Sequence, residues 1–339
     1  MKKLWNKFKN THLLVKLFII IDFIIMLCFL MVYGPIDKAR VFWITTAMET
    51  ATHKYFANIF YSEDTIKSVM SENYLIEIEE DSDIDSIKIG QEEKITSFTS
   101  IYEKEILERE EGALYKLIQF KYKEFDCHMV AIYDPKRIEV AYQSKLNRGK
   151  VLSDILKDHN GILGINGGGY FWSSGYPRGL VVHDGKVVYS SSTGSFVTAG
   201  FTEDGVLVAG KMSASDVKKK GIKEAVSFNP ALIVNGKAST FKGNGGSGLN
   251  PRTVIAQRKD GIVLFLVVNG YGSRLSWKGR GGVYVTDLIK ILQRYGAYNA
   301  VNMDGGSSST MVINGKLIND PCEPQKDGQD FIRSAWILK

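Results

Sequence analysis

The chain opens with a basic segment and continues into one long apolar run. The run over residues 13–33 is long enough to cross a bilayer as a helix, and four lysines precede it, at positions 2, 3, 7 and 9. Positive charge stays on the cytoplasmic side, so the pattern predicts a cytoplasmic basic tail (1–12) and a transmembrane anchor (13–33). Asp22 in the run is either tolerated or functional. Residues 34–37 are a poor cleavage site, which predicts an uncleaved anchor with everything after Tyr33 outside the cytoplasm.

The next segment, residues 34–112, has the pattern of an extracytoplasmic stalk and an acidic connector. Apolar spacing over 47–61 predicts a helix, and Ser62 begins a second short helix that reaches Met70. Acidic residues crowd the part that follows, at positions 77, 79, 80, 81, 83 and 85. Residues 76–112 are therefore expected to form a solvated, loosely ordered connector or an irregular lobe.

From residue 113 the pattern changes to short β-branched and aromatic runs separated by turn signals. Five Asp-Gly or Asn-Gly pairs lie between apolar residues, at 184–185, 204–205, 235–236, 260–261 and 314–315. Such a pair between alternating apolar residues is the strongest local signal for a β-hairpin. Residues 113–339 are therefore predicted to form one domain rich in hairpins.

Three helices are expected among these hairpins. They cover 152–159 before Gly161, 213–220 with Ser213 as cap and Gly221 as stop, and 286–295 before Gly296. The third has Leu288, Ile291, Leu292 and Tyr295 on one face. Hairpins with a few packed helices predict an α+β fold with a mixed, largely antiparallel sheet, preceded by one transmembrane helix.

Composition and charge exclude several classes of protein. The 339 residues are 44% hydrophobic and carry a net charge of +6, with one dense basic run at 218–220, so nucleic acid is not an expected partner. Neither the histidines nor the cysteines have metal-type spacing, and no metal or cofactor is expected. Cys28 lies in the apolar run, while Cys127 and Cys322 form a disulfide or remain two buried thiols.

Two glycine-rich runs carry the candidate chemistry. Residues 165–171 read INGGGYF and residues 302–309 read NMDGGSSS. Glycines allow positive φ and close approach to a ligand, and a plain turn does not need three of them. Asp304 is the best carboxylate, because Gly305 and Gly306 leave room for a sugar or phosphate beside it. Ser307 to Ser309 then donate to an anion. The alternative is that Asp304 only caps a turn.

Arginines supply the candidate phosphate ligands. Arg252 begins a strand-like run beside the flexible loop 243–248, and its planar fork suits phosphate, although a surface ion pair is the alternative. That loop matches GxGxxG, but Pro251 follows and no helix opens, so a dinucleotide site is rejected. Arg178 and Arg333 are further cations. Aromatic residues 170–172 either stack on a sugar ring or belong to the core.

The motifs Asn166–Phe171, Asn250–Thr253 and Asp304–Ser308 together resemble the phosphodiester glycosidase family, over roughly residues 125–339. Residues 134–138 and 45–46 are similar to a bacterial, membrane-anchored branch. The resemblance implies removal of a sugar from a phosphodiester. One departure is Asn269, where many relatives carry aspartate and this chain lacks the carboxylate.

The expected protein is thus an extracytoplasmic, membrane-anchored glycosidase that cleaves a sugar-1-phosphodiester in cell-envelope glycopolymer, such as teichoic acid decoration or exopolysaccharide. Asp304 acts as nucleophile or base, Arg252 holds the phosphate, and Asn166 and Asn269 orient sugar hydroxyls. The alternative is a non-catalytic module that binds envelope polysaccharide. The remaining expected substrate-binding residues are Gly167, Gly168, Tyr170, Phe171, Arg178, Gly179, Gly305, Gly306, Ser307 and Ser308.

Overall fold

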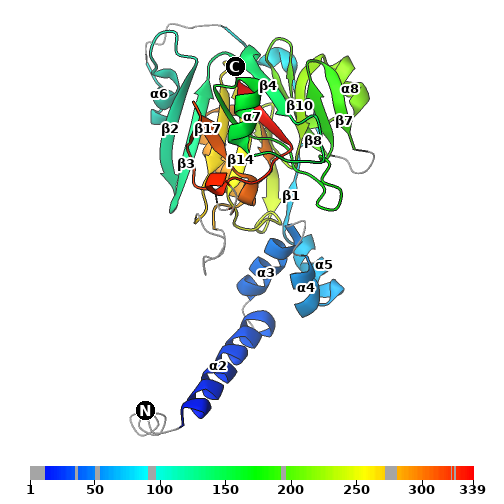
Figure 1. The fold of residues 1–339 in the computed structure, drawn as a ribbon, viewed down its shortest axis with the longest axis vertical. Coiled ribbons are helices and arrows are strands. Elements are labelled where there is room, and N and C mark those ends of the chain that lie inside the picture. The colour runs from blue at the N-terminus through cyan, green and yellow to red at the C-terminus, as the bar shows by residue number, and fades with distance from the viewer. Residues whose placement is uncertain are drawn as a thin grey trace. The chain divides into compact units, whose positions relative to one another are not determined.

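The computed structural model describes residues 12–34, 37–49, 54–90, 97–191, 196–271, 281–321, 323 and 326–339. The chain divides into two compact units, Met1–Glu72 and Asn73–Lys339, each of which is described by itself. The α-helices of the described residues are α2 (Leu13–Tyr33), α3 (Asp37–Glu49), α4 (Tyr55–Phe60), α5 (Glu63–Ser71), α6 (Ile101–Leu107), α7 (Leu152–His159), α8 (Ala214–Lys219) and α9 (Val285–Arg294) (Figure 1). Short 3-10 helices are η1 (Ile84–Ser86), η2 (Pro135–Arg137), η3 (Gly306–Ser308) and η4 (Lys326–Gly328).

The first unit is helical. Helix α2 has the predicted bounds, and its segment Leu13–Leu30, with a mean hydropathy of 2.8, is long and apolar enough to cross a membrane. Helices α3, α4 and α5 bury a small apolar cluster around Ile44 and Ala57. Ser62 caps α5 as predicted, accepting the Thr65 N–H at 3.2 Å. The predicted helix over 47–61 is instead two helices, with residues 50–53 outside the described part.

The second unit is built from antiparallel sheets. The largest has seven strands in the order β12-β11-β16-β14-β15-β3-β2, and two five-stranded sheets have the orders β18-β17-β5-β19-β4 and β7-β6-β10-β8-β9. A two-stranded sheet joins β1 to β13. The strands are β1 (Tyr74–Ile76), β2 (Tyr115–Tyr122), β3 (Phe125–Ile132), β4 (Ile138–Tyr142), β5 (Leu163–Asn166), β6 (Leu180–His183), β7 (Lys186–Ser190), β8 (Val197–Thr202), β9 (Leu207–Lys211), β10 (Ile222–Ser227), β11 (Ala231–Val234), β12 (Lys237–Ala238), β13 (Thr240–Lys242), β14 (Arg252–Arg258), β15 (Val263–Val268), β16 (Ala297–Met303), β17 (Met311–Ile313), β18 (Lys316–Leu317) and β19 (Ser334–Leu338).

The three large sheets face one another around a common apolar core, because their strands alternate between two buried faces. In β15, Phe265 points into the shared core, whereas Leu264 and Leu266 pack on the outer side. Trp336 lies at the centre, fully buried, with its ring edge-on to Phe201 at 5.5 Å and its indole N–H on the Met303 sulfur at 3.3 Å. These three side chains come from three different sheets and tie them together.

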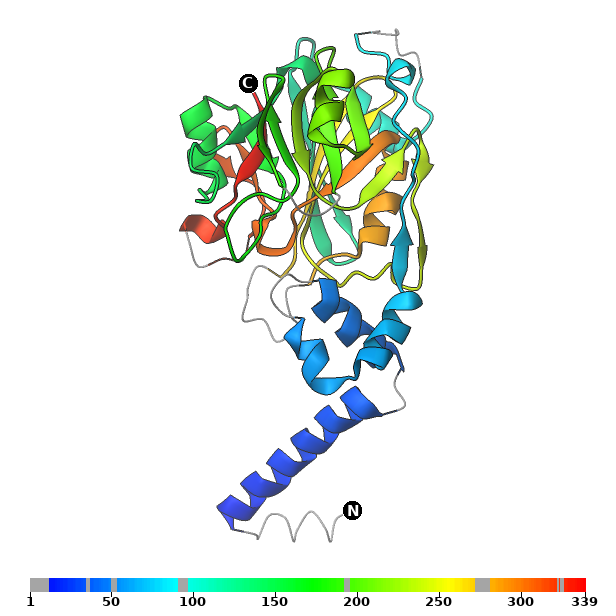
Figure 2. The same cartoon turned by 90° about the vertical axis from the view of Figure 1, so that its right-hand side faces the viewer.

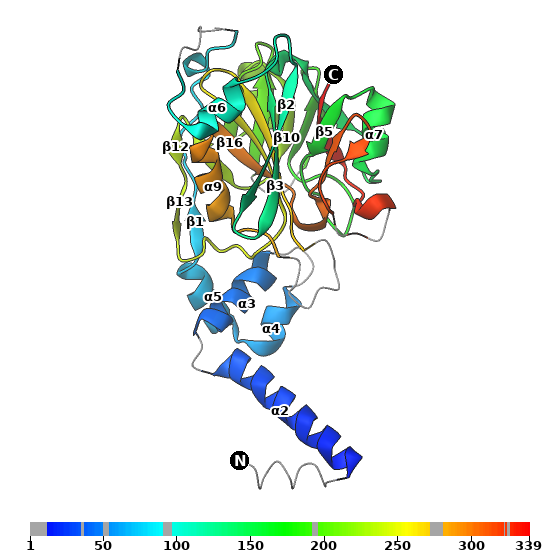
Figure 3. The ribbon, with the colours of Figure 1, turned by 90° about the vertical axis from the view of Figure 1, so that its left-hand side faces the viewer.

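Helices cover the outer faces of the sheets. Helix α9 packs its apolar face on the seven-stranded sheet beside α6 (Figure 3), α7 covers the sheet that contains β5, and α8 covers the sheet that contains β10 (Figure 2). The predicted helices at 152–159, 213–220 and 286–295 correspond to α7, α8 and α9. Leu288, Ile291, Leu292 and Tyr295 of α9 are all buried, as their spacing predicts.

All five predicted hairpin turns are confirmed. The pairs 184–185, 235–236 and 314–315 have positive φ at both residues and join β6 to β7, β11 to β12 and β17 to β18. The other two have positive φ at the glycine, Gly205 between β8 and β9 and Gly261 between β14 and β15. The predicted α+β class with largely antiparallel sheets is therefore correct.

The compact second unit begins at Asn73, whereas the sequence pattern placed the domain start at residue 113. Its acidic first part pairs with the sheets instead of remaining a loose connector. Strand β1 pairs with β13, the Ser82 hydroxyl bonds to both backbone groups of Ala209, and the Glu80 carboxylate lies 2.7 Å from the Lys237 ammonium. Ile106 of α6 is fully buried. Composition missed this because most of the acidic side chains are exposed, while strand pairing and a few specific side-chain contacts join the segment to the sheets.

A fragment of residues 73–339 should therefore be more stable than a fragment of residues 113–339. The shorter one loses the β1–β13 pairing and uncovers the face of the seven-stranded sheet beneath Ile106. We expect its Tm to be lower by at least about 5 °C, or the fragment to aggregate, because several kcal/mol of burial are lost. Thermal unfolding by circular dichroism measures this. Equal Tm values would mean that residues 73–112 are a mere connector.

Candidate active site

The two glycine-rich runs meet at one buried amide. Asn166 ends β5 and is fully buried. Its Nδ2 donates to the Asp304 carbonyl at 2.7 Å, and its Oδ1 accepts the Thr253 hydroxyl at 2.7 Å and the Thr310 N–H at 3.1 Å. The amide thus joins the end of β5 to β14 and to both sides of the second glycine run. The sequence predicted that Asn166 contacts sugar; the structure places it inside the protein, where it positions Asp304.

The glycines of the first run allow backbone to approach backbone. A Cβ on Gly167 would lie 2.7 Å from the Ser334 Oγ, and one on Gly168 would lie 2.5 Å from the Ser227 carbonyl oxygen. A Cβ on Gly169 would lie 2.7 Å from the Phe228 ring and 3.6 Å from the Asp304 carboxyl carbon. The first two glycines are therefore required by packing, and the third leaves space beside the carboxylate.

Asp304 follows the end of β16 and is only partly exposed. Its backbone N–H donates to the Gly167 carbonyl at 3.1 Å, and its Oδ1 accepts the Gly305 N–H at 3.1 Å. Desolvation raises the pKa of the Asp304 carboxyl to about 6, and the negative charge of Asp330 adds to this rise. Hydrogen bonds from the Ser308 hydroxyl and the Gly305 amide, together with the Arg178 charge, oppose the rise. A carboxyl with this pKa can exchange a proton near neutral pH.

A second carboxylate, Asp330, lies in the same cluster, and sequence reasoning missed it. Its Oδ2 accepts the hydroxyls of Ser307 and Ser308 at 3.4 and 3.2 Å, and its Oδ1 accepts the Phe331 N–H at 2.7 Å. Because the Ser308 hydroxyl interacts with Asp304 as well, it links the two carboxylates. The serines that were predicted to bind an anion thus orient the carboxylates. No motif marks Asp330, which precedes β19 and reaches the site through the fold.

Two arginines face the carboxylates. The Arg178 guanidinium carbon lies 5.3 Å from the centre of the Phe171 ring, and its buried Nε has no hydrogen-bond acceptor within the described residues. The Arg333 guanidinium lies 3.8 Å from the centre of the Tyr170 ring and donates to the carbonyls of Gly175 and Phe331. Desolvation lowers the pKa of Arg333, while the charges of Tyr170, Asp330 and Asp304 oppose this. A buried, unpaired arginine donor indicates an anionic ligand.

Arg252 lies beside the second glycine run, and two of its donors bind backbone carbonyls. It is 4% exposed, and its Nε and Nη2 donate to the carbonyls of Val283 and Gly248 at 3.1 and 2.7 Å. A Cβ added to Gly305 would lie 3.8 Å from the Arg252 Cδ and 3.9 Å from its Nη1. The guanidinium therefore holds loops that surround the second glycine run. Among the arginines, Arg178 fits the predicted phosphate ligand better.

Asn269 is also used inside the protein. It is 9% exposed, its Oδ1 accepts the Asp320 N–H at 3.2 Å, and its Nδ2 lies 3.5 Å from the His128 Nε2. Burial lowers the pKa of His128. Asn269, which stands where many relatives carry aspartate, is therefore a hydrogen-bonded amide. The two carboxylates of the site are Asp304 and Asp330.

The other expected residues surround the cluster. Desolvation raises the pKa of Tyr170 to about 12, with the charges of Asp330 and Asp304 adding to it, and its ring stacks on the exposed Trp172. Phe171 packs edge-on against Phe196 at 6.3 Å. Gly179 and Gly306 have φ of 73° and 64°, and a Cβ on Gly305 would lie 2.9 Å from the Pro251 carbonyl oxygen. These glycines are fixed by conformation and packing.

Cys127 is a free, buried thiol whose pKa burial raises to about 12. Cys322 lies outside the described residues, so a disulfide between Cys127 and Cys322 stays a prediction.

Sequence comparisons identify the family of the chain. The profile of the phosphodiester glycosidase family matches residues 159–337, more than half of the chain. The chain belongs to the phosphodiester glycosidase family. The matched range contains Asn166, Arg178, Arg252, Asp304 and Asp330.

Several individual proteins and one solved structure are similar to this chain. The SPbeta prophage-derived protein YomE of Bacillus subtilis is 30% identical over 53% of this chain and 28% of its own length. Mouse N-acetylglucosamine-1-phosphodiester alpha-N-acetylglucosaminidase is 25% identical over 48% of this chain and 34% of its own length. The alignments thus span about a third of these relatives. The catalytic domain of the zebrafish enzyme of the same name, auto-inhibited by its pro-peptide, shares the fold with a TM-score of 0.56 at 21% identity, over 68% of this chain and 85% of that one.

The raised pKa of Asp304 predicts a stability effect with a definite sign. Its pKa is about 6 in the folded protein against an ordinary 3.8, so the folded state binds the proton more tightly and ionisation above pH 6 destabilises it. Asp304→Asn should therefore raise the free energy of unfolding by about 1–3 kcal/mol at pH 8 and by little below pH 4. Urea unfolding at both pH values measures this.

The reverse exchange, Asn166→Asp, is the matched control. It replaces the Nδ2 donor to the Asp304 carbonyl with a buried charge and should lower the unfolding free energy by about 3 kcal/mol at pH 8. A loss of stability in Asp304→Asn at pH 8 would show that the carboxylate is needed for the fold.

Proposed function

We propose that this protein hydrolyses a sugar-1-phosphodiester, at the bond between the sugar C1 and the phosphate oxygen. The observation that carries the proposal is the Asp304–Asp330 pair linked through Ser308, together with Arg178, whose charge acts on Asp304 and whose buried Nε has no partner among the described residues. Glycoside cleavage uses two carboxylates, and a phosphate requires a planar cation such as arginine. The family membership supports the same reaction class.

The charges suggest a division of roles. Asp304, with its pKa of about 6, acts as the base that removes a proton from the attacking water. Asp330, held by two hydroxyls and one amide, stabilises the positive charge that develops at C1. The C1–O bond breaks with its electron pair on the phosphate, which Arg178 and Arg333 neutralise. The phosphate is a good leaving group, so a strong general acid is not required.

The substrate is expected to be a cell-envelope glycopolymer, with the second unit outside the cytoplasm and α2 as a single membrane anchor. The apolar α2 and the lysines before it support this topology. The alternative, a non-catalytic module that binds polysaccharide, was motivated by the missing carboxylate at Asn269. Asp330 supplies a carboxylate beside Asp304, so the hydrolase is the better reading of the site.

We expect Asp304→Asn to lower kcat on an aryl sugar-1-phosphodiester at least about a hundredfold, since a positioned base contributes 10²–10⁴-fold. In the unaltered protein, kcat/KM should fall tenfold per pH unit below about 6, because protonation removes the base. Steady-state kinetics between pH 4 and 8 measure both. A rate that falls above pH 6 instead would make Asp304 an acid, and activity near normal in Asp304→Asn would remove it from the mechanism.

Arginine exchanges separate the phosphate ligand from the structural arginine. Arg178→Lys should weaken turnover of phosphodiesters about tenfold or more relative to simple aryl glycosides, because only the former present a phosphate. Arg252→Lys should affect both substrates equally and lower Tm, since the Arg252 Nε and Nη2 hold the backbone carbonyls of Val283 and Gly248. If Arg252→Lys weakened phosphodiester turnover selectively and Arg178→Lys affected both substrates equally, Arg252 would be the phosphate ligand.

Protease added to intact protoplasts should digest the second unit, because in the proposed topology, which α2 and its preceding lysines support, the residues after Tyr33 lie outside the cytoplasm. Immunoblotting with an antibody to residues 73–339 measures this, with a cytoplasmic protein as the control. A domain protected in protoplasts but cut after lysis would contradict the topology and the envelope substrate.

A further inference from the structure

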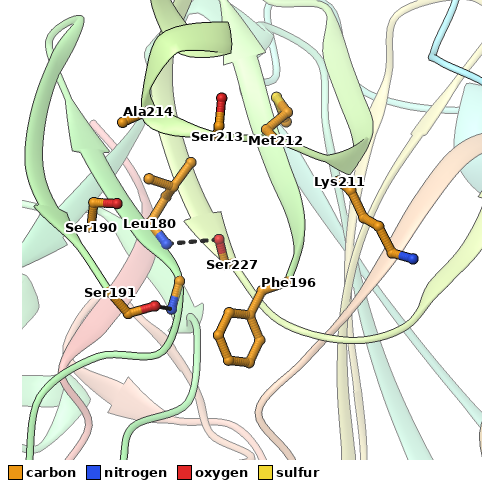
Figure 4. Close-up of a pocket in the computed structure, with 10 residues that line it drawn as sticks. Leu180, Ser190, Ser191, Phe196, Lys211, Met212, Ser213, Ala214 and Ser227 are labelled. Carbon is orange, nitrogen blue, oxygen red and sulfur yellow. Dashed lines mark hydrogen bonds between the residues drawn. The ribbon is translucent and has the colours of Figure 1, made fainter. Parts of the chain in front are cut away.

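A cavity of about 290 Å³ lies on the outer face of the sheet that contains β10, beside the start of α8 (Figure 4). This volume is at the lower end of small-molecule binding pockets, so it suits a single ring and not an extended chain. Residues from β6, β7, β9 and β10 line it. They are Gly179, Leu180, Ser190, Ser191, Phe196, Lys211, Met212, Ser213, Ala214 and Ser227.

Apart from Lys211, the residues that line this cavity are uncharged, and four of them are serines. Ser191 accepts the Gly179 N–H at 3.1 Å, which fixes its hydroxyl oxygen at the wall. The Ser227 hydroxyl is buried, accepts the Leu180 N–H at 2.8 Å and lies 2.6 Å from the Thr198 hydroxyl. The Ser190 hydroxyl has no hydrogen-bond partner in the described part of the chain. Lys211 extends away from the other lining residues in Figure 4, and its charge acts on Glu77. Hydroxyls beside an aromatic ring and a thioether match an uncharged sugar.

The cavity adjoins the candidate active site through three contacts. Gly179 of the wall follows Arg178 directly in the chain. Phe196 of the wall packs on Phe171, which carries the Arg178 guanidinium over its face. Ser227 of the wall precedes Phe228, whose ring abuts Gly169 beside the Asp304 carboxyl. The wall of the cavity is thus connected to Arg178 and to the surroundings of the Asp304 carboxyl.

We infer that the cavity binds one neutral sugar unit of a polymer whose neighbouring sugar-1-phosphodiester is cleaved at Asp304, so that the substrate is a chain of sugars and not an isolated sugar phosphodiester. The inference rests on the proposed hydrolysis. It extends the proposed hydrolysis by naming a second sugar-binding position, on the outer face of the sheet that contains β10. This position is formed by residues outside the two glycine-rich motifs.

Filling the cavity tests the inference without touching the carboxylates. Ala214 lines the cavity from the first turn of α8, whereas Ser215 lies on the same helix outside it. Ala214→Trp should lower the ratio of kcat/KM for a purified glycopolymer joined by sugar-1-phosphodiesters to kcat/KM for an aryl sugar-1-phosphodiester at least about tenfold. Ser215→Trp should leave the ratio within about twofold, because it adds the same bulk elsewhere. A ratio unchanged in Ala214→Trp overturns the inference.

Ser190→Ala provides a variant that adds no bulk. Loss of its unpartnered hydroxyl should lower the same ratio about threefold to tenfold, the cost of one hydrogen bond to a ligand. Thermal unfolding of each variant excludes misfolding as the cause. An equal loss on both substrates in both cavity variants would overturn the inference, because it would reveal a structural effect on the active site.

Failure of the proposed hydrolysis is distinguishable. If the unaltered protein turns over neither substrate, the hydrolysis is wrong, and calorimetric titration with oligosaccharides from the same polymer then tests the cavity alone. Ala214→Trp should bind them at least about tenfold more weakly than the unaltered protein and Ser215→Trp equally well. Equal affinities in all three proteins, or no binding by any, would overturn the cavity inference as well.

Discussion

The buried amide of Asn166 is the contact on which the site depends. One side chain from β5 donates to the Asp304 carbonyl and accepts from Thr253 on β14 and from the Thr310 backbone. These hydrogen bonds fix the distance between β5 and β14, which belong to different sheets. The carboxylate of Asp304 lies beside the end of β5 and the start of β14. A side chain on Gly167 would clash with Ser334 at the start of β19, and one on Gly168 with the Ser227 carbonyl at the end of β10, which explains why the first run contains consecutive glycines. The glycine motif is thus chiefly a packing device that serves the second run.

Around the Asn166 contacts the protein places carboxylates and arginines, whose opposite charges suit two parts of one substrate. The carboxylates of Asp304 and Asp330 share the Ser308 hydroxyl, and desolvation, with a smaller contribution from the charge of Asp330, raises the pKa of Asp304. Arg178 and Arg333 lie over aromatic rings, which hold the guanidiniums in place without consuming all of their donors. Carboxylates beside a sugar C1 and arginines beside a phosphate are the arrangement that a sugar phosphodiester requires.

Local features of the fold were predictable from the sequence, and tertiary ones were not. The Asp-Gly and Asn-Gly turns, the Ser213 cap of α8 and the glycines after α8 and α9 are encoded within a few residues, so their positions were predicted correctly. Helix α7 instead ends at Asn160, which has the left-handed conformation expected for Gly161. The start of the second unit was placed too late, because residues 73–112 join it through backbone pairing and isolated contacts such as Ile106. Asp304 was recognisable from its glycines. Asp330 carries no local motif, and Arg252 has the sequence context of a ligand but is buried among carbonyls.

The central claim is that sugar and phosphate are bound by different members of one cluster. A crystal structure of the Asp304→Asn variant with a sugar-1-phosphate tests it most directly, because turnover is suppressed and the fold is retained. The account predicts the sugar C1 beside residue 304 and Asp330, with the phosphate oxygens on the guanidinium of Arg178. A phosphate bound at Arg252 and remote from both carboxylates would contradict it.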